Sequence, residues 1–445
     1  MGVGRVGLAG PLLLIVVPIL LLLVRLPRLA LAALLGSVVA IEAPDLIFPF
    51  GEASYDPVFS GLTIPDILLL VLMVGTALEL RRAGARPRLP EPFTLPLLLL
   101  VAAVAAGAAT GYFAGVAPAE LVRAATPLAY LILVPLLTVN LLTNDGQLRL
   151  FAAAAAALAA YKGLTGAASS LTGAGETIEG GSISFYEPLA NLLLLAFVLA
   201  GLAALIRKVS LPAWVVVMVP VAAVALLLSY RRSFWIGAVL GILLVALVAS
   251  RRRGRALAWI AGVGVCLVLA AALTFGQGGQ AYGGVAGRAR LLEPGQFGST
   301  SGDRYRLDEQ RNVLADLRDS PIIGIGLAEP WRVRYPLAES HDRRYVHRAV
   351  LWYWLRFGLL GVAAYVWLMG TALWAAFGVW RRHDDAVIRV CALALLGAVA
   401  ALVVVELTAT FTGVETRMSI GVGALFGWLA AARADVDEGR PAVPT

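Results

Sequence analysis

Long apolar stretches separated by short polar loops run along almost the whole chain. Most hold about 17–25 residues, enough for one helix to cross roughly 30 Å of hydrocarbon. No alternation of apolar and polar positions typical of β-barrel strands appears. The first two stretches are joined only by "RLPR" (25–28), and Glu42 lies near the end of the second, so the pattern allows twelve or thirteen spans. The predicted helices are residues 8–24, 29–43, 63–80, 93–115, 124–142, 149–170, 185–206, 211–228, 233–249, 256–275, 350–378, 386–410 and 413–432.

Composition predicts an all-α polytopic membrane protein. Hydrophobic residues make up 60% of the chain, charged residues 14%, and the mean hydropathy is +0.84, far more apolar than a soluble core requires. The first apolar stretch lacks a small-residue cleavage pattern and is followed at once by the next, so we expect a retained helix. Cys266 and Cys391 lie within predicted spans, where cysteine behaves as a small apolar residue.

Basic residues in the short loops predict the orientation. Arginine-rich loops fall on one side of the predicted spans, and such loops tend to stay in the cytoplasm. They are residues 81–88, 207–208, 250–255 and 381–385. The expected organisation is an N-terminal transmembrane bundle (1–275), an extracytoplasmic loop (276–349), C-terminal transmembrane helices (350–432) and a disordered cytoplasmic tail (433–445).

The net charge of +8 comes almost entirely from arginine. A nucleic-acid-binding protein would need a soluble basic domain, and none is present in the sequence. The glycines of "GQGGQAYGGVAG" (276–287) lack the strand and helix that flank a phosphate-binding loop, so we interpret them as a flexible segment.

Arginines mark two places on the predicted outer side. Arg231 and Arg232 open a span there, against the orientation rule; they either extend to lipid headgroups or form an anion site, since the forked guanidinium pairs bidentately with phosphate. In the long loop, residues 304–327 carry Arg304 and Arg306 at the start of a predicted amphipathic helix. Its expected apolar face is Leu307, Val313, Leu314 and Leu317.

His347 stands where the long loop ends and the next span begins. An imidazole can accept a proton from a hydroxyl, which makes this residue the candidate general base; a helix-capping or interfacial role is the alternative. His341 lies in the loop and His383 in a predicted cytoplasmic loop. The three histidines therefore imply no metal site, and no cofactor is expected.

Three sequence blocks resemble the O-antigen ligase and O-antigen polymerase superfamily. "RRSFWIG" (231–237) is similar to the arginine motif that opens a span in this family. "RLDEQRNVLADLRDSPIIGIGL" (306–327) is similar to its Arg…Ala-Leu…Pro-Leu-x-Gly-x-Gly motif, and "HRAVLWYWLRFGLLG" (347–361) to its His…Gly-Leu-x-Gly motif. "SFYEPLANLLLLAF" (184–197) is a weaker fourth likeness.

The resemblance implies a GT-C-like helical membrane protein that transfers a glycan from an undecaprenyl-diphosphate-linked donor to a glycan or lipid acceptor. It implies the cytoplasmic membrane as the location and its outer face as the reaction side. Arg232 and Arg306 would hold the diphosphate, with Arg231 and Arg304 beside them, and His347 would activate the acceptor hydroxyl. The implied reaction is a metal-independent, inverting glycosyl transfer.

A transporter that binds the same anionic lipid without chemistry is the rival interpretation. Such a protein is expected to show paired half-structures and broken spans at matching positions. The candidate residues instead gather on one predicted side, which favours an enzyme. Ligase and polymerase stay equally open, because nothing in the sequence identifies the acceptor.

Overall fold

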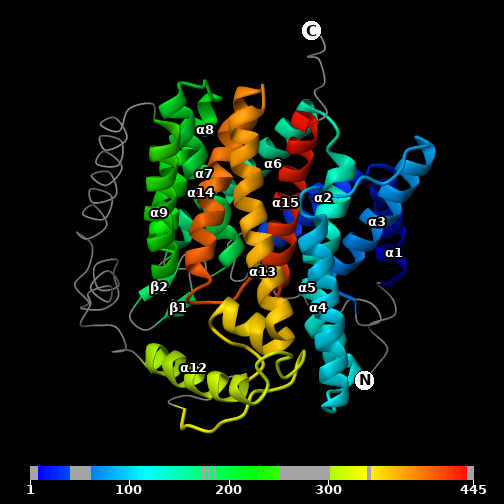
Figure 1. Cartoon of the computed structure of the whole chain (residues 1–445). Helices are drawn as coiled ribbons and strands as arrows, with labels where there is room; N and C mark the ends of the chain where they lie inside the picture. Colours follow the sequence, from blue (N-terminus) through cyan, green and yellow to red (C-terminus); the bar gives the residue numbers. More distant parts are fainter. Residues whose placement is uncertain are drawn as a thin grey trace.

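The computed structural model describes residues 9–40, 62–172, 176–178, 181–183, 187–229, 231–250, 301–337 and 342–437. Most helices of this part run side by side as a bundle, and one helix, α12, lies across an end of it (Figure 1). The strands of the described residues form one short antiparallel hairpin, β1 (Glu176–Ile178) and β2 (Gly181–Ile183). The protein is therefore an all-α polytopic membrane protein in class, as its composition predicts.

The helix boundaries confirm twelve of the thirteen predicted stretches, and the remaining one, 256–275, lies outside the described residues. The helices are α1 (Ala9–Arg25), α2 (Pro27–Ala40), α3 (Ile64–Arg82), α4 (Thr94–Phe113), α5 (Pro118–Leu141), α6 (Asp145–Thr172), α7 (Pro188–Arg207), α8 (Ala213–Leu228), α9 (Arg232–Ala249), α12 (Ser301–Asp319), α13 (Ala349–Arg382), α14 (Ala386–Val405) and α15 (Thr416–Asp437). α15 thus continues into the predicted tail, of which residues 438–445 lie outside the described part.

Seven of the described helices are long and apolar enough to cross a membrane: α4, α5, α6, α7, α9, α13 and α14. α1 and α2 meet at 120° because Pro27 disfavours the helical conformation in the residue before it. This bend favours one broken span at the N-terminus, which agrees with the lower predicted count. The total number of spans stays a prediction.

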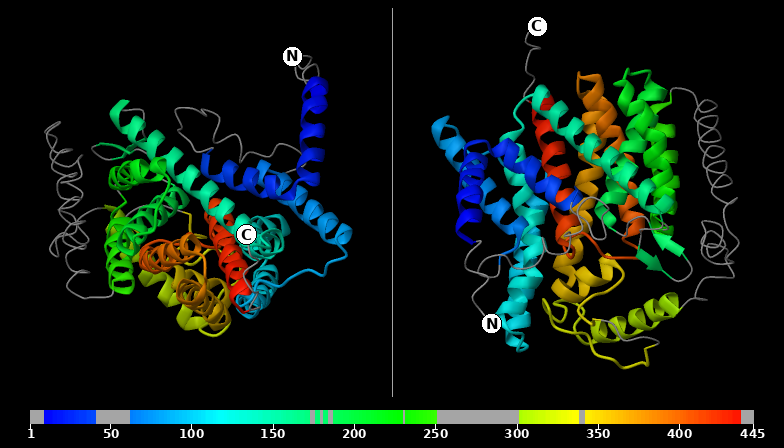
Figure 2. Two further views of the ribbon diagram at one scale, coloured as in Figure 1. Left: turned by 90° about the horizontal axis from the view of Figure 1, so that it is seen from above. Right: turned by 180° about the vertical axis from the view of Figure 1, so that it is seen from behind.

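Small residues allow helices from the two ends of the sequence to share one core. A Cβ added to Gly241 of α9 would lie 3.0 Å from the carbonyl oxygen of Gly397 in α14. One added to Gly427 of α15 would lie 2.5 Å from Cβ of Thr138 in α5. Backbones approach this closely only where side chains are small. α14 and α15 therefore pack among the N-terminal helices, as Figure 2 shows from above and from behind.

The predicted arginine-rich loops that the structure describes (81–88, 207–208 and 381–385) lie towards the end of the bundle opposite α12 (Figure 1). There, the backbone N–H of Arg88 donates to Oδ1 of Asn140 at 2.8 Å, and α7 and α13 end at Arg207 and Arg382. At the α12 end, a guanidinium nitrogen of Arg344 lies 2.9 Å from a carboxylate oxygen of Glu120. The described loops thus lie at two opposite ends of the bundle, in line with the charge pattern.

Candidate functional site

α12 presents a polar face to the rest of the protein. Tyr305, Glu309, Asn312, Val313 and Asp316 are buried, and their spacing of three to four residues places them on one side of the helix. The predicted apolar face is therefore only partly correct. Val313 and Leu317 are buried, but Leu307 is 48% exposed. Acids and an amide occupy this face because they hold loop backbone rather than a hydrocarbon core.

Asn312 and Asp316 fasten the loop that follows α12. Oδ1 of Asn312 accepts the backbone N–H groups of Arg334 at 2.6 Å and Tyr335 at 2.8 Å, and its amide donates to the carbonyl of Tyr335 at 3.0 Å. Asp316 accepts the backbone N–H of Arg332 at 2.7 Å. These bonds hold residues 332–335 of the loop against α12.

His347 is held by Glu309 through two kinds of contact. The backbone N–H of His347 donates to Oε2 of Glu309 at 2.8 Å, and ring atom Nδ1 lies 3.0 Å from Oε1. Glu309 is 2% exposed, whereas the histidine side chain is 23% exposed. Nδ1–H donates a hydrogen bond to the carboxylate, so Nε2 carries the free lone pair. No described residue forms a hydrogen bond with Nε2.

Two tyrosine rings flank the imidazole edge-on. The ring centroids of Tyr305 and Tyr345 lie 5.8 Å and 4.7 Å from that of His347. The hydroxyl of Tyr345 donates to the carbonyl of Thr410 and accepts its N–H, both at 3.0 Å. Thr410 belongs to the loop between α14 and α15, so these two hydrogen bonds connect the surroundings of the histidine to the last helical hairpin.

Tyr345 also shows which charges converge on the site. Burial raises the pKa of its phenol to about 12; among the smaller causes, the charge of Glu309 raises the pKa and those of Arg231 and Arg306 lower it. Charges act on a group in this way only from nearby. Arg231 also lies over the ring of Phe411, with Cζ 5.6 Å from the ring centroid.

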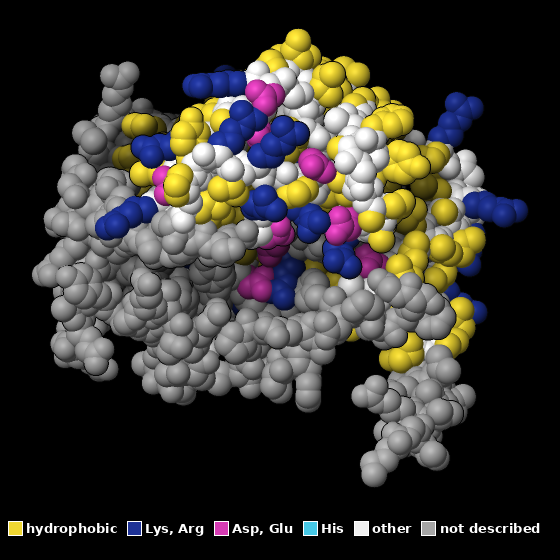
Figure 3. Space-filling model, turned by 90° about the horizontal axis from the view of Figure 1, so that it is seen from below, with side chains coloured by type: hydrophobic (Ala, Val, Ile, Leu, Met, Phe, Trp, Pro, Cys, Tyr) yellow, Lys and Arg dark blue, Asp and Glu magenta, His cyan; other side chains and the backbone are white. Residues whose placement is uncertain are grey.

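The structure therefore brings Arg231, Arg306 and His347 together around Tyr345. Arg232 is the first residue of α9, directly after Arg231 at its N-cap, where the helix dipole also favours an anion. Arg304 is exposed on α12, two residues before Arg306. Seen from the α12 side, basic and acidic side chains gather near the middle of this face (Figure 3).

Glycines of two sequence blocks lock the loop onto α13. Gly358 interrupts α13 with a φ of 63°, and a Cβ there would lie 1.9 Å from the carbonyl oxygen of Ile322. Leu359 donates its N–H to that carbonyl at 3.0 Å. Gly324, with a φ of 77°, approaches the carbonyl of Leu355 so closely that a Cβ would lie 2.4 Å away. Both positions need glycine, since only glycine adopts this backbone freely and leaves room.

Arg356 completes this support from inside the protein. It is fully buried, and its guanidinium donates to the carbonyls of Gly326 at 3.2 Å, Arg344 at 2.6 Å and Glu329. A buried charge is tolerated when its hydrogen bonds are satisfied. Arg356 thus ties both ends of the loop that leads to His347.

A family model described as O-Antigen ligase matches residues 215–366, about a third of the chain. This match supports the O-antigen ligase/polymerase superfamily for the part of the chain that it covers. A comparison with curated proteins found no match.

The part that matches the O-antigen ligase family contains α9, α12 and the first half of α13. It therefore includes every candidate site residue: Arg231, Arg232, Arg304, Arg306 and His347. At the level of the family, this match supports glycan transfer, lipid-linked glycans as the substrate class and a multi-pass membrane protein.

Two site residues escaped the sequence analysis. Glu309 follows Arg306 by one helical turn in "RLDEQRN", and an acid on the buried side of an amphipathic helix is a detectable signal. Glu309 was not predicted, because the buried face of the helix was assigned from its leucines and valine, and because Asp308 beside it is also acidic. Arg356 lies within an apolar span, where a charge is usually functional or paired.

Glu406 and Arg417 flank the loop between α14 and α15, but they do not form an ion pair with each other. Arg417 forms its ion pair with Glu187 at the start of α7. Glu406 accepts hydrogen bonds from the hydroxyl of Tyr365 and, at 2.7 Å, from the N–H of Thr412. The loop after α14 folds back over Glu406, which brings these donors closer than the arginine.

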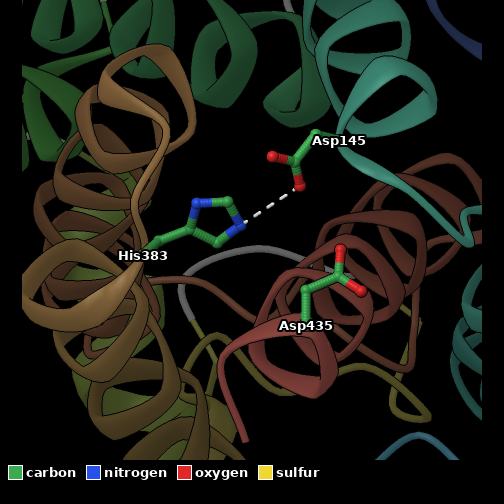
Figure 4. A group of neighbouring side chains, drawn as sticks. All are labelled: Asp145, His383 and Asp435. Carbon is green, nitrogen blue, oxygen red and sulfur yellow. Dashed lines mark ion pairs between the residues drawn. The ribbon is translucent and has the colours of Figure 1, made fainter. Parts of the chain in front are cut away.

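A second cluster of polar side chains lies at the end opposite α12. Nε2 of His383 is 3.6 Å from Oδ1 of Asp145, and potential ligand atoms of these residues and Asp435 lie within 4.8 Å of one another (Figure 4). Nδ1 of His383 accepts the N–H of Asp385 at 3.1 Å, so the ring proton sits on Nε2 and points towards the acids. A cation would need that lone pair; the cluster fits a polar contact between α6, α13 and α15.

Proposed function

We propose that this protein transfers a glycan from an undecaprenyl-diphosphate-linked donor to an acceptor hydroxyl, with His347 as the general base. The observation that carries the proposal is the pairing of His347 with the buried Glu309, which leaves Nε2 as the proton acceptor at a site that also contains Arg231 and Arg306. The family match supports the reaction class, and this geometry supports the roles.

His347 would take the proton of the attacking hydroxyl. As the acceptor oxygen approaches the anomeric carbon, its proton moves to Nε2, and the charge that develops on the imidazole is balanced by Glu309 at 3.0 Å. Because Glu309 also accepts the backbone N–H of His347, the ring keeps its orientation through the step. A base of this kind typically contributes about 10²–10⁴ in rate.

The arginines would bind the leaving group. The bond between the anomeric carbon and the diphosphate oxygen breaks as the new glycosidic bond forms, and the released polyprenyl diphosphate keeps the electron pair. Arg231, Arg232 and Arg306 would neutralise that charge, with Arg304 near the entrance on α12. Guanidinium groups can do this without a metal. Direct displacement inverts the anomeric carbon, and no protein nucleophile is required.

The reaction would take place on the outer face of the cytoplasmic membrane. The described arginine-rich loops lie towards the end opposite the site, and such loops favour the cytoplasm. On this orientation, α12, the loop after it and His347 would lie outside, where a lipid-linked donor and a surface glycan or lipid acceptor would meet.

The decisive experiment uses purified protein, a synthetic polyprenyl-diphosphate glycan and a hydroxyl acceptor in liposomes. We expect release of polyprenyl diphosphate that matches formation of a new glycoside, with the opposite anomeric configuration to the donor. Movement of the donor across the bilayer with no release would instead indicate a transporter. A product with retained configuration would overturn the direct displacement.

A further inference from the structure

Three arginines from three helices line one pocket at the end of the bundle opposite His347. Arg207 ends α7, Arg381 lies in the last turn of α13, and Arg389 lies in the first turn of α14. The cavity they share has a volume of about 250 Å³, and Trp380 forms part of its wall. The residues come together only because the α7–α8 and α13–α14 loops lie side by side.

The pocket carries positive charge without a matching acid. None of its lining residues is acidic, and within the described residues no carboxylate forms an ion pair with Arg207, Arg381 or Arg389. Asp384 and Asp385 precede α14, but neither lines the pocket. Asp385 is already engaged, because it caps α14 and pairs with Arg149 at 3.3 Å.

Helix dipoles do not account for all three charges. Arg207 and Arg381 stand at helix C-termini, where a cation stabilises the helix. Arg389 stands near the N-terminus of α14, where a cation is unfavourable. Three like charges around one small cavity also repel one another. A bound anion would offset both costs, and the forked guanidinium geometry suits the oxygens of a phosphate.

An apolar cavity adjoins the arginine pocket. It has a volume of about 270 Å³, shares Val390 with the pocket, and lies between α6, α7, α8 and α14. Phe197, Leu211 and Trp214 are among its lining residues, and Arg149 and Ser210 are its polar ones. A phosphate site directly beside a cavity of this kind matches a molecule with an anionic head and a hydrocarbon tail.

We propose that this end of the protein binds an anionic phospholipid of the adjacent leaflet. The phosphate would lie among Arg207, Arg381 and Arg389, and one acyl chain would enter the neighbouring apolar cavity. Basic pockets between membrane helices bind lipid headgroups in this manner. The site is separate from His347, so it does not rest on the proposed reaction.

The test is native mass spectrometry of the purified full chain titrated with dioleoyl phosphatidylglycerol or dioleoyl phosphatidylcholine. We expect phosphatidylglycerol to bind at least about tenfold more tightly, and Arg389→Gln to remove that preference. Arg207→Gln, at the exposed end of α7, should have the same effect without a risk to folding. Arg318→Gln, on α12 at the other end, is the matched control and should change nothing. Equal affinity for the two lipids, or a preference that survives Arg389→Gln and Arg207→Gln, would overturn the proposal.

Competition separates a lipid from a small anion. Inorganic phosphate and glycerophosphoglycerol carry the charged group without the chains, and each should need a concentration at least about 100-fold higher to displace phosphatidylglycerol. Displacement by either at a concentration comparable to that of the lipid would mean that the pocket takes a free anion, and the phospholipid assignment would be wrong.

Discussion

A single buried carboxylate orients the candidate base: Oε1 of Glu309 lies 3.0 Å from Nδ1 of His347, while Oε2 of Glu309 accepts the backbone N–H of His347 at 2.8 Å. The two residues belong to different elements, since Glu309 lies in α12 and His347 just before α13. Contact with both the ring and the backbone fixes where the imidazole lies and which nitrogen is free. α12 is therefore part of the site rather than a cover over it.

Glu309→Gln is expected to lower kcat for glycan transfer by about 10²–10⁴. The side-chain amide of the glutamine can donate to Nδ1 and so favour the tautomer in which Nε2 carries the proton. Because it is neutral, it also cannot balance the charge of the imidazolium. The KM for the donor should stay close to that of the wild type, because the arginines are untouched. Steady-state kinetics of polyprenyl diphosphate release measure both constants.

Glu309→Asp is the conservative control for that variant. It keeps the negative charge at a shorter reach and should recover part of the lost kcat. If Glu309→Gln and Glu309→Asp impair transfer equally and also lower thermal stability equally, Glu309 has a purely structural role.

His347→Ala is expected to slow glycan transfer by about 10²–10⁴ while the protein still inserts into the membrane and folds. The side chain is partly exposed at the surface of the site, so its loss leaves little unfilled space. Folding is checked by size-exclusion chromatography and thermal unfolding, and transfer by product formation. Near-normal transfer by this variant would remove the base assignment.

Arg232→Lys and Arg306→Lys are each expected to reduce transfer and to weaken donor binding by at least about tenfold. Lysine keeps the charge but loses the bidentate fork that suits a diphosphate. Arg318→Lys, exposed on α12, is the matched control and should behave like the wild type. Unchanged donor affinity in Arg232→Lys would reduce that arginine to an anchor for lipid headgroups.

Gly358→Ala is expected to destabilise the protein by about 2–4 kcal/mol. Its Cβ would lie 1.9 Å from the carbonyl of Ile322, and the φ of 63° is unfavourable for alanine. Gly370→Ala, in the same helix, meets no atom within 4 Å and should be neutral or stabilising by about 0.5–1 kcal/mol. Thermal unfolding compares the two variants, and similar melting temperatures would contradict the role given to Gly358.

Tyr345→Phe is expected to lower the free energy of unfolding by about 1–3 kcal/mol. The N–H and the carbonyl of the buried Thr410 both lose the Tyr345 hydroxyl as their hydrogen-bond partner. The pKa of Tyr345 is raised by burial to about 12, whereas an unfolded tyrosine ionises near pH 10. Its contribution to stability is complete below about pH 10 and is lost as the pH rises towards 12. The melting temperature of the wild type should therefore fall more steeply with pH over this range than that of Tyr345→Phe.

Much of the fold could be predicted because hydrophobic periodicity and length decide where a chain forms membrane helices. The ranges of α13 and α14 and the start of α12 follow from this pattern. The bend at Pro27 was less visible, since two apolar stretches in a row also fit two separate spans. The face of α12 was only partly predicted, because its leucines suggested hydrocarbon contacts while Asn312 and Asp316 in fact bind loop backbone.

The site was predictable where a residue type is rare or stands out of place. His347 is one of three histidines, and Arg231 breaks the orientation rule. Glu309 and Arg356 act through tertiary contacts with residues far along the chain, and neither spacing nor composition shows such contacts. The close approach of Gly324 to α13 likewise depends on how two distant segments meet.

The most direct test of the central claim is a double-mutant cycle on His347 and Glu309. The rate of polyprenyl diphosphate release is measured with saturating donor for the wild type, His347→Ala, Glu309→Gln and the double variant. If Glu309 acts through His347, the double variant will be no slower than His347→Ala alone, because the carboxylate has nothing left to orient. If the rate of the double variant is reduced by the product of the two single-variant factors, the residues act independently, and the account is contradicted.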